Sequence, residues 1–258
     1  MNESIRVCRI SKSYGRVKAL KDVSFTVAPG EVYGVIGPNG AGKTTLLSIV
    51  AGLRRADEGT CYVLGEPVRA GNFPLIHRVG FFSPNLGVLD YLRGGEMILT
   101  VGRLHGLSPE EARRRTDELL KFFDLTGASQ QFVCEYSQGM RMKVGLACAL
   151  IHGPSVLLLD EPFTGLDPTA VYRLVHTLQP MAARGKAILV SSHDLGLVER
   201  ICDRVGILHQ GELKEELRLK GGDGRLQSVS PERGRPAGLE ENLWGVVGRP
   251  EVPEFDWL

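Results

Sequence analysis

Short apolar runs and amphipathic stretches alternate along most of the chain, and this alternation predicts an α/β fold. Near the N-terminus, residues 5–10, 22–37 and 60–65 are rich in β-branched and aromatic residues and punctuated by glycine and proline, which predicts strands. The segment VYGVIG is apolar at nearly every position, as is typical of a strand buried on both faces. A helix over residues 44–53 is expected to follow it.

A predominantly helical block is predicted in the middle of the chain. Residues 95–107 indicate one helix and residues 108–125 indicate a second. Ser108 is the expected N-cap of the second helix, and Glu111 is expected to complete a capping box with it. The apolar residues expected to form one face of this helix are Leu119, Leu120, Phe122 and Phe123.

Strands and helices alternate again after this block, and a polar tail follows. The further strands are expected at 78–82, 155–162 and 187–193, the helices at about 168–183 and 194–202, and a closing hairpin at 204–213. From residue 221 onward, glycine, proline and polar residues indicate a linker. Three aromatic residues of the tail are expected to pack against the protein: Trp244, Phe255 and Trp257.

Composition and charge narrow the class of protein. The chain has 258 residues, and its 24% of charged residues is ordinary for a soluble globular protein. The net charge of +1 argues against nucleic acid as a partner, with a local basic patch as the alternative. No apolar run reaches the roughly 18–20 residues that span a bilayer, and the N-terminal residues lack the apolar region of a signal peptide. The scattered cysteines are expected to be reduced cytosolic thiols without a metal: Cys8, Cys61, Cys134, Cys148 and Cys202.

The loop GPNGAGKT carries the strongest chemical signal. It fits G-x-x-x-x-G-K-[ST] between a predicted strand and a predicted helix, which is the context that a phosphate-binding loop requires. The glycines allow the backbone amides to point at phosphate groups, Lys43 can reach the β- and γ-phosphates, and Thr44 can bind Mg²⁺. A dinucleotide-binding loop is rejected because its glycine spacing differs. The residues expected to contact nucleotide here are Gly37, Pro38, Asn39, Gly40, Ala41, Gly42, Lys43, Thr44 and Thr45.

Two carboxylates end the apolar strand LLLDE. Asp160 suits the second Mg²⁺ position, either directly or through water. Glu161 is the candidate general base that polarises an attacking water. The alternative is a solvated acidic pair with no role in chemistry, which the upstream phosphate loop makes the weaker interpretation.

The motifs GPNGAGKTT, YSQGM, VLLLDEP, TGLDP and SSHD occur in this order, and with them the chain resembles an ATP-binding-cassette (ABC) ATPase, the nucleotide-binding subunit of an ABC transporter. The resemblance implies a P-loop NTPase core with a mostly parallel sheet, an N-terminal antiparallel β-subdomain and an inserted α-helical subdomain. It also implies ATP and Mg²⁺ as cofactors. The implied ATPase domain covers residues 1–217, with the helical insert at about 86–152 and a linker and tail over 218–258.

The motif YSQGM differs from the family's common Leu-Ser-Gly-Gly-Gln signature but retains Ser137 and Gly139, with Gln138 between them. In the family, this signature closes over the nucleotide held by a partner cassette. A helix terminus stabilises charge mainly within its first turn, so two termini must flank the phosphates closely. The resemblance therefore implies a dimer with ATP in the interface, homomeric or heteromeric; the alternative for these residues is an ordinary helix cap.

Three further positions match family motifs. The resemblance implies that Tyr14 stacks on adenine, although a core tyrosine is the alternative. His193 matches the switch histidine that contacts the γ-phosphate and orients the water, so the resemblance assigns catalysis to Glu161, His193 and Lys43. Asp167 matches the aspartate of the dimer-interface loop, and its alternative is a turn residue before a proline.

One residue that the family usually carries is missing. A glutamine normally follows the strand that corresponds to RVGFF, whereas this chain has Pro84 there. Proline offers only its backbone carbonyl, so its side chain cannot bind Mg²⁺ or link the site to the helical block as the family's glutamine does. Asn85 can take the role if the loop is shifted by one residue.

The resemblance leads to one main expectation and two alternatives. The chain is expected to power translocation through a separate transmembrane permease subunit, at the inner face of the cell membrane, and LRGGE in residues 92–96 tilts this toward the ABC-2-type exporter branch. The apolar segment 83–96 either docks that subunit or packs into the core. The alternatives are a soluble ABC ATPase acting on ribosomes or DNA, and a nucleotide-sensing regulatory subunit with weak turnover.

Overall fold

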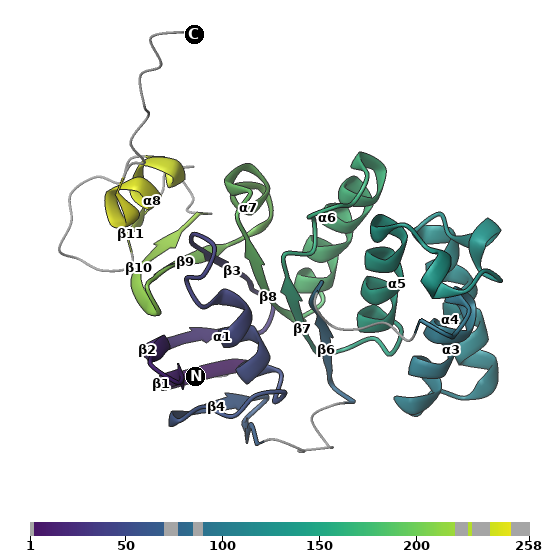
Figure 1. Ribbon diagram of the computed structural model, residues 1–258, viewed down its shortest axis with the longest axis horizontal. Coiled ribbons are helices and arrows are strands. Elements are labelled where there is room, and N and C mark those ends of the chain that lie inside the picture. The colour runs from purple at the N-terminus through teal and green to yellow at the C-terminus, as the bar shows by residue number, and fades with distance from the viewer. Residues whose placement is uncertain (1–2, 70–76, 85–89, 220–226, 229–237, 249–258) are drawn as a thin grey trace, which may run out of the picture.

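The computed structural model describes residues 3–69, 77–84, 90–219, 227–228 and 238–248. Within these residues, strands form an antiparallel sheet and a larger mixed sheet (Figure 1). The antiparallel sheet has the order β2-β1-β4-β5. Its strands are β1 (Ile5–Tyr14), β2 (Val17–Val27), β4 (Glu58–Val63) and β5 (Glu66–Pro67).

The larger sheet has the order β11-β10-β9-β3-β8-β7-β6 and forms the central layer of the described structure. The strands from β9 to β6 run parallel to one another, and β10 and β11 add antiparallel pairs at one edge. The strands that position the site are β3 (Val32–Ile36), β6 (Val79–Phe82), β7 (Val156–Asp160), β8 (Ala187–Ser192) and β9 (Arg204–His209). The expected P-loop NTPase sheet and N-terminal antiparallel subdomain are therefore confirmed.

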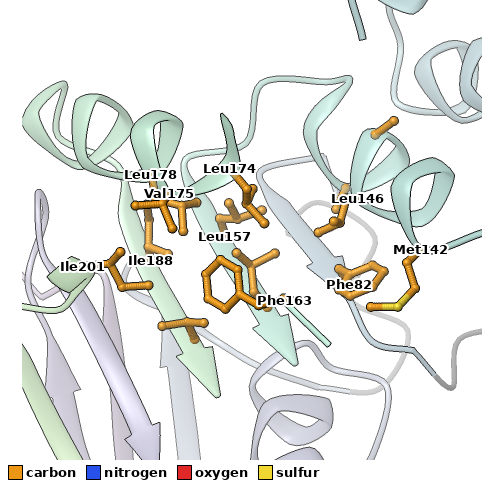
Figure 2. Packing of buried hydrophobic residues seen from close by; sticks show 14 of the residues in the cluster. Phe82, Met142, Leu146, Leu157, Phe163, Leu174, Val175, Leu178, Ile188 and Ile201 are labelled. Atoms are coloured by element: carbon orange, nitrogen blue, oxygen red, sulfur yellow. The ribbon is translucent and has the colours of Figure 1, made fainter. Parts of the chain in front are cut away.

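Apolar side chains cover the central sheet on both faces. In β7, Leu157 and Leu159 belong to one buried cluster, whereas Val156 and Leu158 belong to another on the opposite face. The first cluster receives Leu174, Val175 and Leu178 of α6 (Pro168–Ala183) together with Phe163 and Ile201 (Figure 2). The second is covered by α1 (Lys43–Val50) and the antiparallel sheet. Burial on both faces explains why these strands are continuous apolar runs.

The helical block lies at one end of the molecule (Figure 1). It contains α3 (Gly94–Leu104), α4 (Pro109–Phe122) and α5 (Gln138–Leu150), with short 3₁₀ turns at Thr126–Ala128 and Val133–Glu135. Ser108 caps α4 as predicted, because its Oγ accepts the N–H of Glu111 at 3.2 Å. The expected reciprocal bond of a capping box is absent from the described contacts, since the Glu111 carboxylate accepts from Arg114 and Arg115 instead.

The part of the tail that the structure describes contains regular elements, although its composition indicates a linker. After α7 (Leu195–Ile201), the strands β9 and β10 (Glu212–Arg218) form the predicted hairpin, and β11 (Gln227–Ser228) pairs with β10. A helix that the sequence analysis missed, α8 (Leu239–Val247), packs on α7 and β9. Leu239, Leu243 and Val246 face this contact. Trp244 lies in α8, while Phe255 and Trp257 lie outside the described residues.

Candidate functional site

The loop between β3 and α1 is shaped by glycines that no larger residue could replace. A Cβ atom at Gly37 would lie 2.1 Å from the carbonyl oxygen of Leu208. Gly42, the N-cap of α1, has φ of 109°, and a Cβ there would lie 2.5 Å from the carbonyl oxygen of Ala19. The loop therefore ends at a helix N-terminus, where unpaired amides and the helix dipole favour an anion.

The ammonium group of Lys43 lies across this loop. The residue is 6% exposed, and its Nζ donates to the carbonyl oxygens of Gly37 at 2.7 Å and Pro38 at 3.3 Å. The same Nζ lies 3.4 Å from Oε1 of Glu161. A buried lysine with only carbonyl and carboxylate partners is ready to exchange them for phosphate oxygens.

Asp160 is held rigidly at the end of β7. It is 1% exposed, and its two carboxylate oxygens accept hydrogen bonds from Ser83 Oγ at 2.9 Å and Ser191 Oγ at 2.7 Å. No sequence motif indicated either serine, although the parallel register pairs Asp160 with Ser191 directly. Thr44, Asp160 and Ser83 offer only oxygen donors, so the set fits Mg²⁺, which uses one or two protein ligands together with water and phosphate.

Glu161 has a strained backbone, and its carboxylate accepts hydrogen bonds from His193. Its φ is 47°, which is rare for a residue other than glycine. Its N–H is shared between the carbonyl oxygen of Ser191, at 3.2 Å, and Ser191 Oγ, at 3.0 Å. Oε2 accepts from His193 Nδ1 at 2.7 Å and from the His193 N–H at 3.3 Å. The structure thus brings Glu161 between Lys43 and His193.

Strand order accounts for this convergence. The neighbouring parallel strands β7 and β8 end at the same edge of the sheet, so Glu161 and His193 emerge side by side. The phosphate loop leaves β3, which pairs with β8 on its other side. The side chain of His193 is 61% exposed, so its imidazole can reach a ligand from solvent. Sites at the carboxyl edge of such sheets are typical of α/β folds.

A cleft of about 760 Å³ lies beside the phosphate loop and includes Tyr14 in its wall. Tyr14 is 41% exposed, so the alternative of a core tyrosine is wrong. Lys12 Nζ and Arg54 Cζ each lie 5.6 Å from the centre of its ring. Cationic side chains of the wall favour a polyphosphate ligand: Arg16, Lys18, Lys21 and Lys43.

Ser137 and Gln138 lie exposed at the start of α5, and neither they nor Gly139 line the cleft around the phosphate loop. Ser137 is the N-cap of α5, and its Oγ accepts the N–H of Met140 at 3.3 Å. Ser137 therefore acts as an ordinary helix cap, which was the alternative to a nucleotide contact. This cap leaves the outward face of the α5 N-terminus open to a ligand.

Asp167 is the N-cap of α6, and its Oδ1 accepts the N–H of Ala170 at 2.9 Å. The side chain of Lys143 also lies 2.5 Å from Asp167 Oδ2, a contact that the sequence analysis missed. Hydrogen bonding to Lys143, with the amide of Ala170, lowers the pKa of the Asp167 carboxyl. Pro84 is exposed after β6, and Asn85 lies outside the described residues.

Comparison with known proteins decides the family. Residues 20–164, more than half of the chain, match the family model described as ABC transporter. The chain belongs to the ABC transporter family. A Nod factor export ATP-binding protein I from Paraburkholderia xenovorans is 39% identical over 96% of this chain and 83% of its own length. A daunorubicin resistance ATP-binding protein from Streptomyces coeruleorubidus is 36% identical over 90% of this chain and 75% of its own length.

Solved structures of ABC proteins agree with this assignment. The ATP-binding subunit of an ABC transporter superposes with a TM-score of 0.78 at 33% identity, covering 83% of this chain and 90% of that one. A dimeric post-hydrolysis ATP-binding cassette with ADP and Pi also gives 0.78, at 26% identity over 84% of this chain and 99% of that one. The ABC family member described here spans 56% to 61% of the length of three curated relatives.

Proposed function

We propose that this chain binds ATP with Mg²⁺, hydrolyses it, and thereby powers export through a separate transmembrane subunit. The observation that carries the proposal is the position of the Glu161 carboxylate, 3.4 Å from Lys43 Nζ and 2.7 Å from His193 Nδ1. A base, a cation and a histidine thus meet at a phosphate-binding loop. The proposed ATPase domain covers residues 1–217, with the helical insert at about 86–152 and the tail at 218–258.

The residues divide the work of phosphoryl transfer. Lys43 and the loop amides bind the β- and γ-phosphates, and Tyr14 stacks on the base. Glu161 accepts a proton from the attacking water. The water oxygen then bonds to the γ-phosphorus, while the bond between the γ-phosphorus and the leaving oxygen of ADP breaks. His193 contacts both Glu161 and the γ-phosphate and so fixes their relative positions. Thr44 and Asp160 would hold Mg²⁺, which would neutralise charge on the phosphates when bound.

A second cassette, identical or different, would complete each site. The support for a dimer is that Ser137, Gln138 and Gly139 do not line this chain's own nucleotide cleft and that Ser137 and Gln138 are exposed. A similar solved cassette is dimeric and contains ADP and Pi. Asp167, next to α5, would lie in the same interface.

Export through a membrane partner is supported by the names of relatives. These include proteins of Nod factor export, daunorubicin resistance and linearmycin resistance. No helix of the described chain is long and apolar enough to cross a bilayer. Tyr91, 90% exposed in the segment at the start of the helical block, is the proposed anchor for the permease. Three apolar neighbours fall outside the described residues: Leu86, Val88 and Leu89.

The test is ATP turnover by the complex reconstituted with its permease. Glu161→Gln removes the base and retains the size of the side chain, so turnover falls by about 10²–10⁴-fold while ATP still binds. Glu118→Gln, on the exposed face of α4, is the control and retains wild-type turnover.

Pro84 favours one other function, a nucleotide-sensing subunit with weak turnover. Equal and very low turnover of the wild type and Glu161→Gln in that complex would support this second function. It would also overturn the catalytic assignment.

A further inference from the structure

One face of the signature helix α5 packs against the loop of residues 161–167, which follows β7. Gly139, Met142 and Lys143 lie three and four positions apart and therefore share a helix face. A Cβ at Gly139 would lie 2.9 Å from the carbonyl oxygen of Gly165, and a Cβ at Gly165 would lie 3.2 Å from the Met142 sulfur. The backbones of α5 and of this loop are therefore in close contact at Gly139 and Gly165.

An ion pair joins the same two segments. Lys143 Nζ lies 2.5 Å from Asp167 Oδ2, and the Lys143 side chain is 13% exposed, against 46% for that of Asp167. Because Asp167 also accepts the N–H of Ala170, two donors fix its carboxylate at the start of α6. Because the Lys143 side chain is largely shielded from solvent, this pair is screened less by water and salt than a fully exposed surface pair.

The loop from Glu161 to Asp167 is short and internally bonded. The N–H of Thr164 donates to the carbonyl oxygen of Glu161, and that of Leu166 donates to the carbonyl oxygen of Phe163, both at 3.3 Å. Phe163 is 8% exposed and anchors the loop in the core. A displacement of Asp167 therefore reaches Glu161 through a compact segment with few ways to absorb it.

We propose that Lys143 is a positioning residue that couples the α5 terminus to Glu161 of the same chain. Ser137 lies six residues before Lys143, about 9 Å along a rigid helix. Under the proposed function, on which this inference rests, Ser137 contacts the nucleotide of the partner cassette. Seating of that nucleotide would move α5, and the Lys143–Asp167 pair would transmit the movement to the catalytic carboxylate. Each site would then sense its neighbour through Lys143.

The experiment compares Lys143→Met and Lys143→Arg in the complex reconstituted with its permease. Lys143→Met is expected to lower maximal turnover by about 10–100-fold, because small misplacement of catalytic groups is costly. The Hill coefficient for ATP falls toward one, since coupling between sites is lost. Affinity of the isolated chain for ATP stays within about twofold of wild type. Lys143→Arg retains the ion pair and restores both turnover and cooperativity.

The control is Lys121→Met, an exposed lysine near the end of α4, which keeps wild-type turnover and Hill coefficient. If Lys143→Met melts at a lower temperature than the wild type, Lys143→Gln is used in its place. Wild-type turnover and cooperativity in the folded, uncharged variant would overturn the coupling role while leaving the proposed function standing. By contrast, failure of the proposed function would appear in the wild type itself, as turnover no higher than that of Glu161→Gln.

Discussion

At the scale of single residues, Glu161 shows how the fold prepares a reactive group. Its backbone is held at a φ of 47°, at a cost of roughly 1–3 kcal/mol, by the bonds from its N–H to Ser191. The carboxylate of this residue lies between Lys43 and His193. Backbone strain therefore coincides with the candidate base, as is common at functional sites.

His152 gives a residue-scale prediction about pH. Its ring stacks on that of His105, with centres 3.8 Å apart, and its Nε2 lies 3.2 Å from the carbonyl oxygen of Val79. Burial, with His105, lowers the pKa of His152 to about 4, and burial, with His77, lowers the pKa of His105. Both rings therefore remain neutral in the folded protein under conditions that protonate them in the unfolded chain.

The sign of the effect follows from proton binding. Between about pH 6.5 and pH 4 the unfolded chain binds a proton at His152 that the folded chain does not, and the lowered pKa of His105 acts in the same direction. The free energy of unfolding should fall as pH falls through that window, by at most about 1.4 kcal/mol per pH unit for each proton. Urea denaturation of His152→Phe should show a shallower pH dependence than wild type. The control is His176→Phe, at an exposed histidine, which should keep the wild-type pH dependence. If the free energy of unfolding of His152→Phe depended on pH as steeply as that of the wild type, the lowered pKa of His152 would be contradicted.

Residue-level partners were the hardest part of the site to predict. The motifs indicated Lys43, Asp160 and Glu161, because each belongs to a spacing with a known chemical reason. Ser83 could not be predicted as a partner of Asp160, since the two are separated by 77 positions and meet only through the pairing of β6 with β7. Such contacts depend on strand register, which periodicity alone does not provide.

At the scale of elements, a largely buried network joins the β9–β10 hairpin to β3 within the central sheet. Arg204 of β9 pairs with Glu31 at 3.0 Å and Glu216 at 2.7 Å. Tyr33 of β3 donates its hydroxyl to Glu216 at 2.7 Å. Burial, together with Glu216, raises the pKa of Tyr33 well above its usual value, so the phenol remains a donor. The network thus ties β10 to the strand that leads into the phosphate loop.

Breaking this network should destabilise the fold. Arg204→Met leaves Glu31 and Glu216, with side chains 10% and 22% exposed, without their cation. The expected loss is about 3–5 kcal/mol, measured by chemical denaturation. The control is Arg9→Met, which breaks the exposed Arg9–Asp22 pair, 82% and 64% exposed, and should cost under about 1 kcal/mol. Equal losses in the two variants would refute the structural role of the network.

Elements with a strong hydrophobic pattern were predicted well, and α8 shows why others were not. Helix α6 was expected at about 168–183 and spans Pro168–Ala183, because its apolar face is periodic and proline marks its start. In α8, the apolar positions Leu239, Leu243 and Val246 follow a glycine- and proline-rich stretch that indicates a linker. Packing on α7 and β9 stabilises this short helix, as tertiary contacts commonly do.

At the scale of the whole molecule, the proposed function assigns the phosphate loop and the signature of one chain to two different nucleotides. The cleft beside the phosphate loop is lined by β1, β2, α1 and the residues after β7 and β9. The start of α5 belongs instead to the helical block at one end of the described structure (Figure 1). A single chain therefore supplies half of each proposed site, and Lys143 joins the two halves that it supplies.

The most direct measurement of this claim mixes two inactive variants in the reconstituted complex. Lys43→Ala removes the phosphate-loop cation, and Ser137→Arg blocks the signature, at a cost of about 1 kcal/mol for the lost helix cap. In a mixed dimer, one site combines both lesions, while the other pairs an intact phosphate loop with an intact signature. We expect ATP turnover in the mixture well above the sum of the turnovers of the two variants assayed alone. Turnover no higher than that sum, with mixed dimers demonstrably formed, would contradict a site shared between two chains.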